Sequence, residues 1–128
     1  MKTLTAIFFL CAISIAILYS QETKKEEKKE ISLSKDLMPI INKRCIKCHQ
    51  PDSDGDNGYM MDTYENIVKG GKYKKAVVVG KSEESYLITK LLPNPPKGKQ
   101  MPLFSKKKLT EDEVNLFKQW INEGAKDN

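Results

Sequence analysis

The chain has 128 residues, with 22 basic and 17 acidic side chains and a formal net charge of +5. A chain of this length builds one small core, and its 39% hydrophobic and 30% charged residues are close to the composition of soluble globular domains. Because the lysines mostly alternate with glutamates and form no basic stripe with aromatic residues, we expect no nucleic-acid partner.

The first 20 residues are almost entirely apolar after Lys2. The apolar run of about 16 residues is shorter than the roughly 20 that span a bilayer, and it ends at a small residue, Ser20. This pattern predicts that residues 1–20 are a secretory signal peptide, with Cys11 as part of it. The large Leu18 fits the cleavage rule poorly, so an uncleaved anchor is the alternative. We expect export to the periplasm, with membrane association only if the segment is retained.

Two further regions follow the signal. Residues 21–32 begin with QETKKEEKKE, a run without any apolar side chain, and this run predicts a charged, flexible tether. Residues 33–128 carry helix signals and almost no strand signals, so we expect them to form a single all-α domain.

The first two helices are predicted in the first half of this domain. One runs from Leu37 to about Cys45 with Asp36 as its N-cap, and its apolar stripe includes both cysteines of the domain. The second lies within DTYENIVKGG, where Asp62 is the expected cap and Gly70 the expected stop.

Two more helices are predicted toward the C-terminus. The third is SEESYLITKLL, capped by Ser82 and ended by Pro93. The fourth begins with a capping box formed by Thr110 and Glu113 and ends at Gly124. Four short helices with long connections make a thin core for a stable domain, so we expect a further group to fill the interior.

The pentapeptide CIKCH holds Cys45, Cys48 and His49, and His49 is the single histidine of the chain. A thioredoxin-like pair would need a helix N-terminus and flanking strands, and tetrahedral zinc would need a fourth ligand. A disulfide would explain the two thiols but would leave His49 without a role. Covalent haem attachment accounts for all three residues, because two thioethers hold the macrocycle and the next histidine ligates the iron.

The second axial position has three candidates, namely a methionine, a lysine or an open site. Met60 and Met61 stand just before a predicted helix and fit a core-filling role better. Met101 lies in a proline-rich loop and precedes Pro102, which favours an extended backbone there. We therefore predict His49 and Met101 as the iron ligands.

These segments resemble a class I c-type cytochrome with one haem, in particular small bacterial domains with the pattern "PII..RC..CH" and "MP......LT..E......WI..GA". The resemblance implies a cytochrome c-like fold of about four short helices wrapped around one covalently attached haem c, with the first helix packed on the last. It also implies that Tyr64 and Trp120 pack near the haem or its propionates.

The stretch PDSDGDNG after His49 departs from the pattern, and the carbonyl that orients His49 stays unassigned. We interpret this stretch as a flexible turn, because it lacks the glycine and the final glutamate of a calcium loop.

A haem with histidine and methionine ligands has no free iron site, so the expected function is one-electron transfer without enzymatic activity. Two alternatives stay open: a five-coordinate module that binds a gas or another ligand, and an electron-entry domain or subunit of a larger periplasmic oxidoreductase. Peroxidase-like activity is disfavoured because the chain contains one CIKCH. The partners are expected to be redox proteins, and an acidic partner surface would suit the lysines around Met101, which are Lys97, Lys99, Lys106, Lys107 and Lys108.

Overall fold

The computed structural model describes residues 29–53, 58–72 and 74–128. The predicted signal peptide, residues 1–20, and most of the predicted tether lie outside the described residues. Within the described ranges no strand is present, and the fold class predicted from the sequence, all-α, is confirmed. The elements are a π-helical turn η1 (Leu33–Leu37), α2 (Met38–Arg44), α3 (Tyr64–Lys69), a 3₁₀ turn η3 (Ser82–Glu84), α4 (Tyr86–Leu91) and α5 (Glu111–Asn122).

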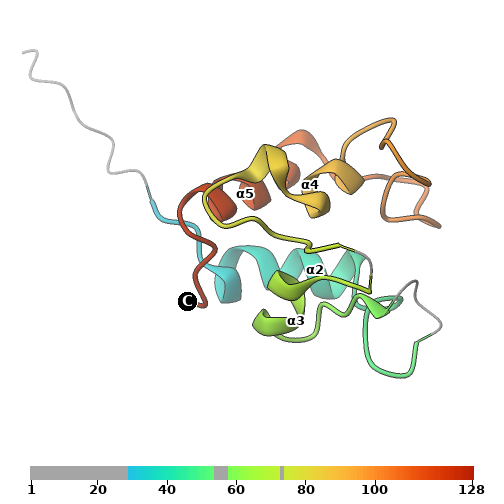
Figure 1. Ribbon diagram of the computed structural model, residues 1–128, viewed down its shortest axis with the longest axis horizontal. Helices are drawn as coiled ribbons and strands as arrows, with labels where there is room; N and C mark the ends of the chain where they lie inside the picture. Colours follow the sequence, from blue (N-terminus) through green and yellow to red (C-terminus); the bar gives the residue numbers. More distant parts are fainter. Residues whose placement is uncertain (1–28, 54–57, 73) are drawn as a thin grey trace, which may run out of the picture.

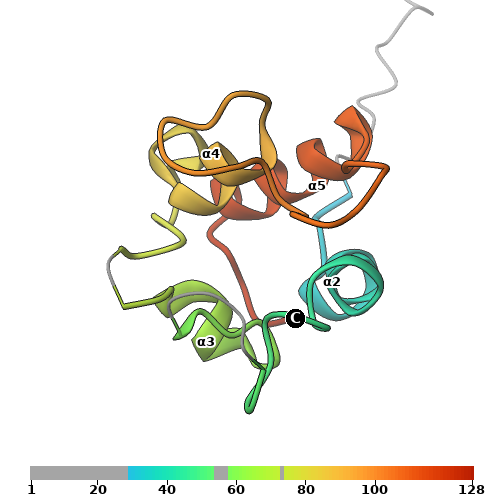
Figure 2. The same ribbon diagram turned by 90° about the vertical axis from the view of Figure 1, so that its right-hand side faces the viewer.

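The helices form two layers, with α4 and α5 in one and α2 and α3 in the other (Figure 1). The turn that follows α2 and the long loop between α4 and α5 lie at the same end of the molecule (Figures 1 and 2). The C-terminal segment leaves α5 and returns to the layer of α2 and α3 (Figure 2). This arrangement brings the CIKCH turn and the loop of Met101 to one end of the fold.

The first helix begins at Leu33 and not at the predicted Leu37. Ser32 is its N-cap, because the Ser32 hydroxyl accepts a hydrogen bond from the backbone N–H of Lys35 at 3.2 Å. Asp36, the predicted cap, instead accepts from the Ser32 N–H at 2.9 Å and so closes the first turn from within. The Ser32 N–H and the nearby lysines lower the pKa of Asp36 below its usual value, because they stabilise the charged carboxylate.

The cap of α3 is Thr63, one residue after the predicted Asp62. The Thr63 hydroxyl accepts from the backbone N–H of Asn66 at 3.2 Å, while the Asp62 carboxylate accepts from the Asn66 side chain at 2.8 Å. Gly70 ends α3 as predicted. Its φ of +86° and the Ala76 nitrogen, only 2.4 Å from where a Cβ would lie, restrict this position to glycine.

The predicted third helix is divided in two at Ser85, which separates η3 from α4. Ser85 is fully buried, and its hydroxyl accepts from the Val78 N–H and donates to the Lys81 carbonyl, both at 2.9 Å. The hydroxyl therefore holds the preceding loop against α4 and leaves the α4 backbone uncapped by a side chain. This local competition for hydrogen bonds explains why one continuous helix does not form.

The last helix, α5, forms as predicted, with a complete capping box. Thr110 Oγ1 accepts from the Glu113 N–H at 3.2 Å, and the Glu113 carboxylate accepts from the Thr110 N–H at 2.9 Å. Helix α5 contacts η1, η3 and α4, so the last helix packs on the turn that begins the first helix. The large hydrophobic side chains buried most completely in the core are Leu37, Ile41, Ile67, Ile88, Phe117, Trp120 and Ile121.

Residues at the end of the predicted tether pack against the end of the chain. Ile31 is buried, and its N–H donates to the Glu123 carboxylate at 3.0 Å. The Ser32 hydroxyl and the Ser34 N–H both donate to the Asn128 carbonyl, at 2.8 and 2.9 Å. In the described part of the chain, the helices lack the length and apolar character needed to span a membrane.

Candidate haem-binding site

The backbone at the end of α2 continues as a tight turn through CIKCH. The Cys45 N–H donates to the Ile41 carbonyl at 2.8 Å, and the N–H groups of Cys48 and His49 both donate to the Cys45 carbonyl at 3.1 Å. Cys45 is half-buried against the core, Cys48 is exposed, and both are free thiols. Two thiols and an imidazole therefore stand together on one turn, and the two thiols remain available for thioether formation.

Burial changes the acidity of the first thiol. Loss of solvent raises the pKa of Cys45 to about 11; the Arg44 charge opposes this shift and the Glu113 charge adds to it. Arg44 also donates to the Lys107 carbonyl at 3.3 Å and lies 4.0 Å from Glu113, so it links α2 to both the Met101 loop and α5. Before any bond is formed, Cys45 is thus a neutral thiol at physiological pH.

The orientation of His49 comes from a residue that sequence analysis missed. His49 Nδ1 lies 2.8 Å from the carbonyl oxygen of Tyr59, and because a carbonyl only accepts, Nδ1 must carry the proton. The Nε2 lone pair is then free to bind a metal. The His49 carbonyl in turn accepts from the Met61 N–H at 2.7 Å, so residues 59–61 hold the histidine from two sides.

Tyr59 is itself held firmly. Its ring makes an edge contact with the His49 ring, with centroids 5.5 Å apart, and its hydroxyl donates to the Ile67 carbonyl at 3.0 Å. Burial raises the pKa of this hydroxyl well above its ordinary value, so Tyr59 stays neutral. No distinctive motif precedes Tyr59, and its position ten residues after His49 becomes meaningful only once the loop is folded.

Met101 is half-buried and packs against the hydrophobic core. Its N–H donates to the Lys90 carbonyl at 2.8 Å, which attaches the loop to the end of α4. The Lys90 ammonium donates to the carbonyls of Lys97 and Lys99 at 2.8 and 2.7 Å. The Lys108 ammonium donates to the Pro102 carbonyl at 2.5 Å. Two ammonium groups therefore fix the backbone on either side of Met101.

Lys108 holds the loop backbone and therefore differs from the other lysines that were expected to attract an acidic partner. Lys108 is half-buried, and its ammonium also lies 3.3 Å from the Gln100 carbonyl, so much of its charge is used inside the loop. The remaining four, Lys97, Lys99, Lys106 and Lys107, are exposed. Lys90, which the sequence did not single out, supports the loop in the same way from the opposite side.

The other candidate residues differ in their surroundings. Met61 is buried in the core, as its sequence position indicated, and Met60 is half-buried. Tyr64 begins α3 and packs half-buried on the core. Trp120 is fully buried, and its indole N–H donates to the Lys126 carbonyl at 2.8 Å, so this N–H is already used within the protein. In the PDSDGDNG stretch, Asp54 and Asp56 lie outside the described residues.

The residues present fit a covalent haem. Two free thiols three residues apart suit two thioether bonds, and a histidine with Nδ1 protonated suits ligation through Nε2. A macrocycle also needs apolar surface, which comes from side chains of α2, α3, α5 and both loops that are only half-buried on the core. These are Met38, Ile40, Cys45, Tyr59, Tyr64, Val68, Leu92, Met101 and Leu116.

An all-α fold with this cysteine and histidine turn is that of a small c-type cytochrome domain. The sequence comparison agrees, because residues 45–102 match the family model of planctomycete cytochrome C. The matched segment begins at Cys45 and ends just after Met101, so it contains Cys45, Cys48, His49 and Met101. This segment is therefore similar to c-type cytochrome domains, a class that binds haem covalently. Neither the curated proteins nor the solved structures include a significant match.

Proposed function

We propose that the protein is a one-electron carrier with a single haem c, attached through Cys45 and Cys48 and ligated by His49 and Met101. The hydrogen bond of 2.8 Å between His49 Nδ1 and the Tyr59 carbonyl carries the proposal, because it fixes the ring and leaves Nε2 unprotonated and able to bind a metal. The bound haem would supply reversible reduction of its iron. The residues of the chain would hold its orientation, exclude water from it and stabilise one of its redox states.

Met101 is the proposed ligand on the other face of the haem. Its loop is fixed by the ammonium groups of Lys90 and Lys108, so its thioether is presented by a rigid segment and not by a mobile one. A soft thioether favours the reduced metal and raises the reduction potential relative to a second histidine. If His49 and Met101 both bind the iron, small substrates would have no access to the metal, which favours an electron carrier over an enzyme.

The ligand assignment is tested with Met101→Ala, using Met60→Ala as the matched control, since both methionines are half-buried. We expect the ferric protein to show a weak far-red band from sulfur coordination. Met101→Ala should abolish this band and lower the midpoint potential, while Met60→Ala should leave both unchanged. If the band is absent from the unaltered protein, or survives in Met101→Ala, the ligation is wrong, and absence in both would favour the five-coordinate module.

The proposal also includes export before haem attachment and cleavage after Ser20. Mass spectrometry of the protein recovered from the periplasm should show one haem on a chain that begins at Gln21. A chain that keeps residues 1–20 and partitions with membranes would support the anchored alternative. A mass without haem would contradict the cofactor assignment itself.

The surface around Met101 suggests the kind of partner. From Ser85 to Thr110 the sequence contains no acidic residue, and it contains six lysines, of which Lys97, Lys99, Lys106 and Lys107 are exposed. Phe104 is 88% exposed within this basic loop. A surface of this kind attracts acidic redox proteins and offers an aromatic contact after encounter. Electron transfer to an anionic iron complex should slow as salt is added, whereas transfer to a cationic complex should quicken.

A further inference from the structure

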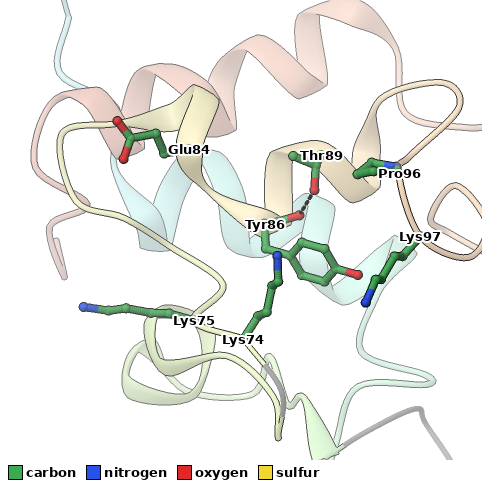
Figure 3. Close-up of a pocket in the computed structure, with 7 residues that line it drawn as sticks. All are labelled: Lys74, Lys75, Glu84, Tyr86, Thr89, Pro96 and Lys97. Carbon is green, nitrogen blue, oxygen red and sulfur yellow. Dashed lines mark hydrogen bonds between the residues drawn. The ribbon is translucent and has the colours of Figure 1, made fainter.

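A second candidate site lies away from the CIKCH turn. A cavity of about 310 Å³ opens between α4, the backbone at residues 74–75 and the loop at residues 96–97 (Figure 3). None of the four proposed haem-binding residues lines it. Its volume is at the lower limit of ordinary small-molecule sites, which run from roughly 300 to 1,000 Å³, so it suits a small ligand better than a peptide.

The cavity is positively charged. Three of its seven lining residues are Lys74, Lys75 and Lys97, and the single acid among them is Glu84. Glu84 is paired with Lys81, 3.0 Å away and outside the cavity, and it lies at the margin in Figure 3. Because α4 and the loop that follows it contain no acidic residue, nothing on that side offsets the lysines.

Three polar groups converge on the middle of the cavity. Figure 3 shows Lys74 and Lys97 directed toward the ring of Tyr86 from opposite sides, whereas Lys75 points away. The Lys74 ammonium lies 5.2 Å from the centroid of the Tyr86 ring, a cation–π contact that keeps this side chain extended across the cavity. The Tyr86 hydroxyl points toward Lys97.

The backbones that carry these groups are fixed. Thr89 Oγ1 donates to the Tyr86 carbonyl at 2.8 Å within α4. The Lys97 carbonyl accepts from the Lys90 ammonium at 2.8 Å, which joins the loop to α4. Within residues 29–53, 58–72 and 74–128, no hydrogen bond uses the Lys97 ammonium or the Tyr86 hydroxyl, so both are available as donors.

We propose that this cavity binds a small molecule through a phosphate or carboxylate group, with the ammonium groups of Lys74 and Lys97 and the hydroxyl of Tyr86 as donors. Charge-assisted hydrogen bonds from two lysines and a hydroxyl match the acceptor oxygens of such a group. The flat face of Tyr86 and the ring of Pro96 provide apolar walls for the rest of the ligand. The site is independent of the haem ligands and of the proposed electron transfer.

The test is a titration of the full-length, haem-loaded protein with inorganic phosphate, pyrophosphate and citrate at constant ionic strength. Amide shifts in NMR spectra should move saturably at Tyr86, Thr89 and Lys97, and calorimetry should give the affinity. The double variant Lys74→Gln/Lys97→Gln should bind at least tenfold more weakly, and Tyr86→Phe severalfold more weakly. Lys106→Gln, an exposed lysine of the same loop outside the cavity, is the matched control and should change little.

The outcomes separate the sources of the anionic group. Saturation by pyrophosphate alone assigns a phosphate ligand, saturation by citrate alone assigns a polycarboxylate, and either result supports the site. The site is overturned if no probe gives saturable shifts, or if Lys106→Gln weakens binding as much as the double variant, which would indicate general attraction to lysines. An unchanged haem spectrum in each variant confirms that folding is intact.

Discussion

The two ends of the molecule are stabilised differently. At the end where η1 meets α5 and the C-terminal segment, Leu37, Ile121 and Ala125 are completely buried, and Asn128 accepts hydrogen bonds from residues 32–34. At the end that carries CIKCH and the Met101 loop, Cys48 is exposed and Met101 is half-buried. The first end is closed by the polypeptide itself, whereas the second is formed mainly by loops whose apolar side chains suit a bound macrocycle.

The largest effect is expected from Cys45→Ala/Cys48→Ala, which removes both sites of attachment. The exported protein should lose covalent haem completely, and amide hydrogen exchange should quicken first in the CIKCH turn and the Met101 loop, with α5 the slowest to lose protection. Mass spectrometry and exchange measurements check this. If haem remains attached to the denatured double variant, the thioether assignment is wrong, and equal loss of protection everywhere would remove the difference between the two ends.

The closed end is tested by Trp120→Ala. Trp120 is 1% exposed, and truncation of a large buried aromatic side chain costs about 3–5 kcal/mol of unfolding free energy. Trp120→Phe keeps most of the packing and should cost less, which separates packing from the lost hydrogen bond to Lys126. Denaturant unfolding of the haem-loaded variants measures both. A cost below about 1 kcal/mol for Trp120→Ala would show that this end is not tightly packed.

Ser85→Ala tests the break between η3 and α4. Removal of the hydroxyl leaves the half-buried Val78 N–H without its partner and takes away one of the two donors to the Lys81 carbonyl, at a cost of about 1–2 kcal/mol. The exposed Ser34 offers a surface comparison for serine-to-alanine substitution, although its hydroxyl also donates to Asn128. Unfolding curves in urea give the difference. A stabilised Ser85→Ala variant would mean that the two turns prefer to join into one helix.

The smallest effect is expected from Asp36→Asn, which should change how the stability of the protein depends on pH under acidic conditions. The folded state holds the pKa of Asp36 below the ordinary 3.8, so its contribution is present above that pH and is lost as the pH falls through the lower folded value. Asp36→Asn should therefore flatten the decline of stability below about pH 4, and Asp127→Asn, a change at an exposed carboxylate, serves as the comparison. Thermal unfolding between pH 2 and 6 measures the slopes. Identical slopes for Asp36→Asn and the unaltered protein would contradict the expectation.

Structural features that depend on residues close together in the sequence were predicted well. Features that depend on contacts formed only in the folded protein were not. The α5 capping box and the stop at Gly70 both involve residues a few positions apart, so spacing alone indicates them. The errors at Asp36 and Asp62 arose because nearby hydroxyls, those of Ser32 and Thr63, cap the helices instead, and propensity does not decide among such neighbouring polar residues.

The groups that hold His49 and the Met101 loop in place show more clearly what the sequence alone does not reveal. The Tyr59 carbonyl is a backbone group, and any residue type offers one, so its contact with His49 has no signature in the side chains. Lys90 and Lys108 are similarly indistinguishable from surface lysines until the loop folds around them. The roles of His49 and Met101 as ligands stay predictions, and the Met101→Ala experiment tests the second of them.

Trp120 is the single tryptophan of the chain, and its indole lies fully buried in α5. A haem absorbs light at the wavelengths at which indole emits, so a nearby haem quenches tryptophan fluorescence by energy transfer. If the haem is attached as proposed, the fluorescence of Trp120 would report on the assembly of the protein. Emission should stay dim in the loaded, folded protein and brighten when the chain unfolds and Trp120 moves away from the attached pigment.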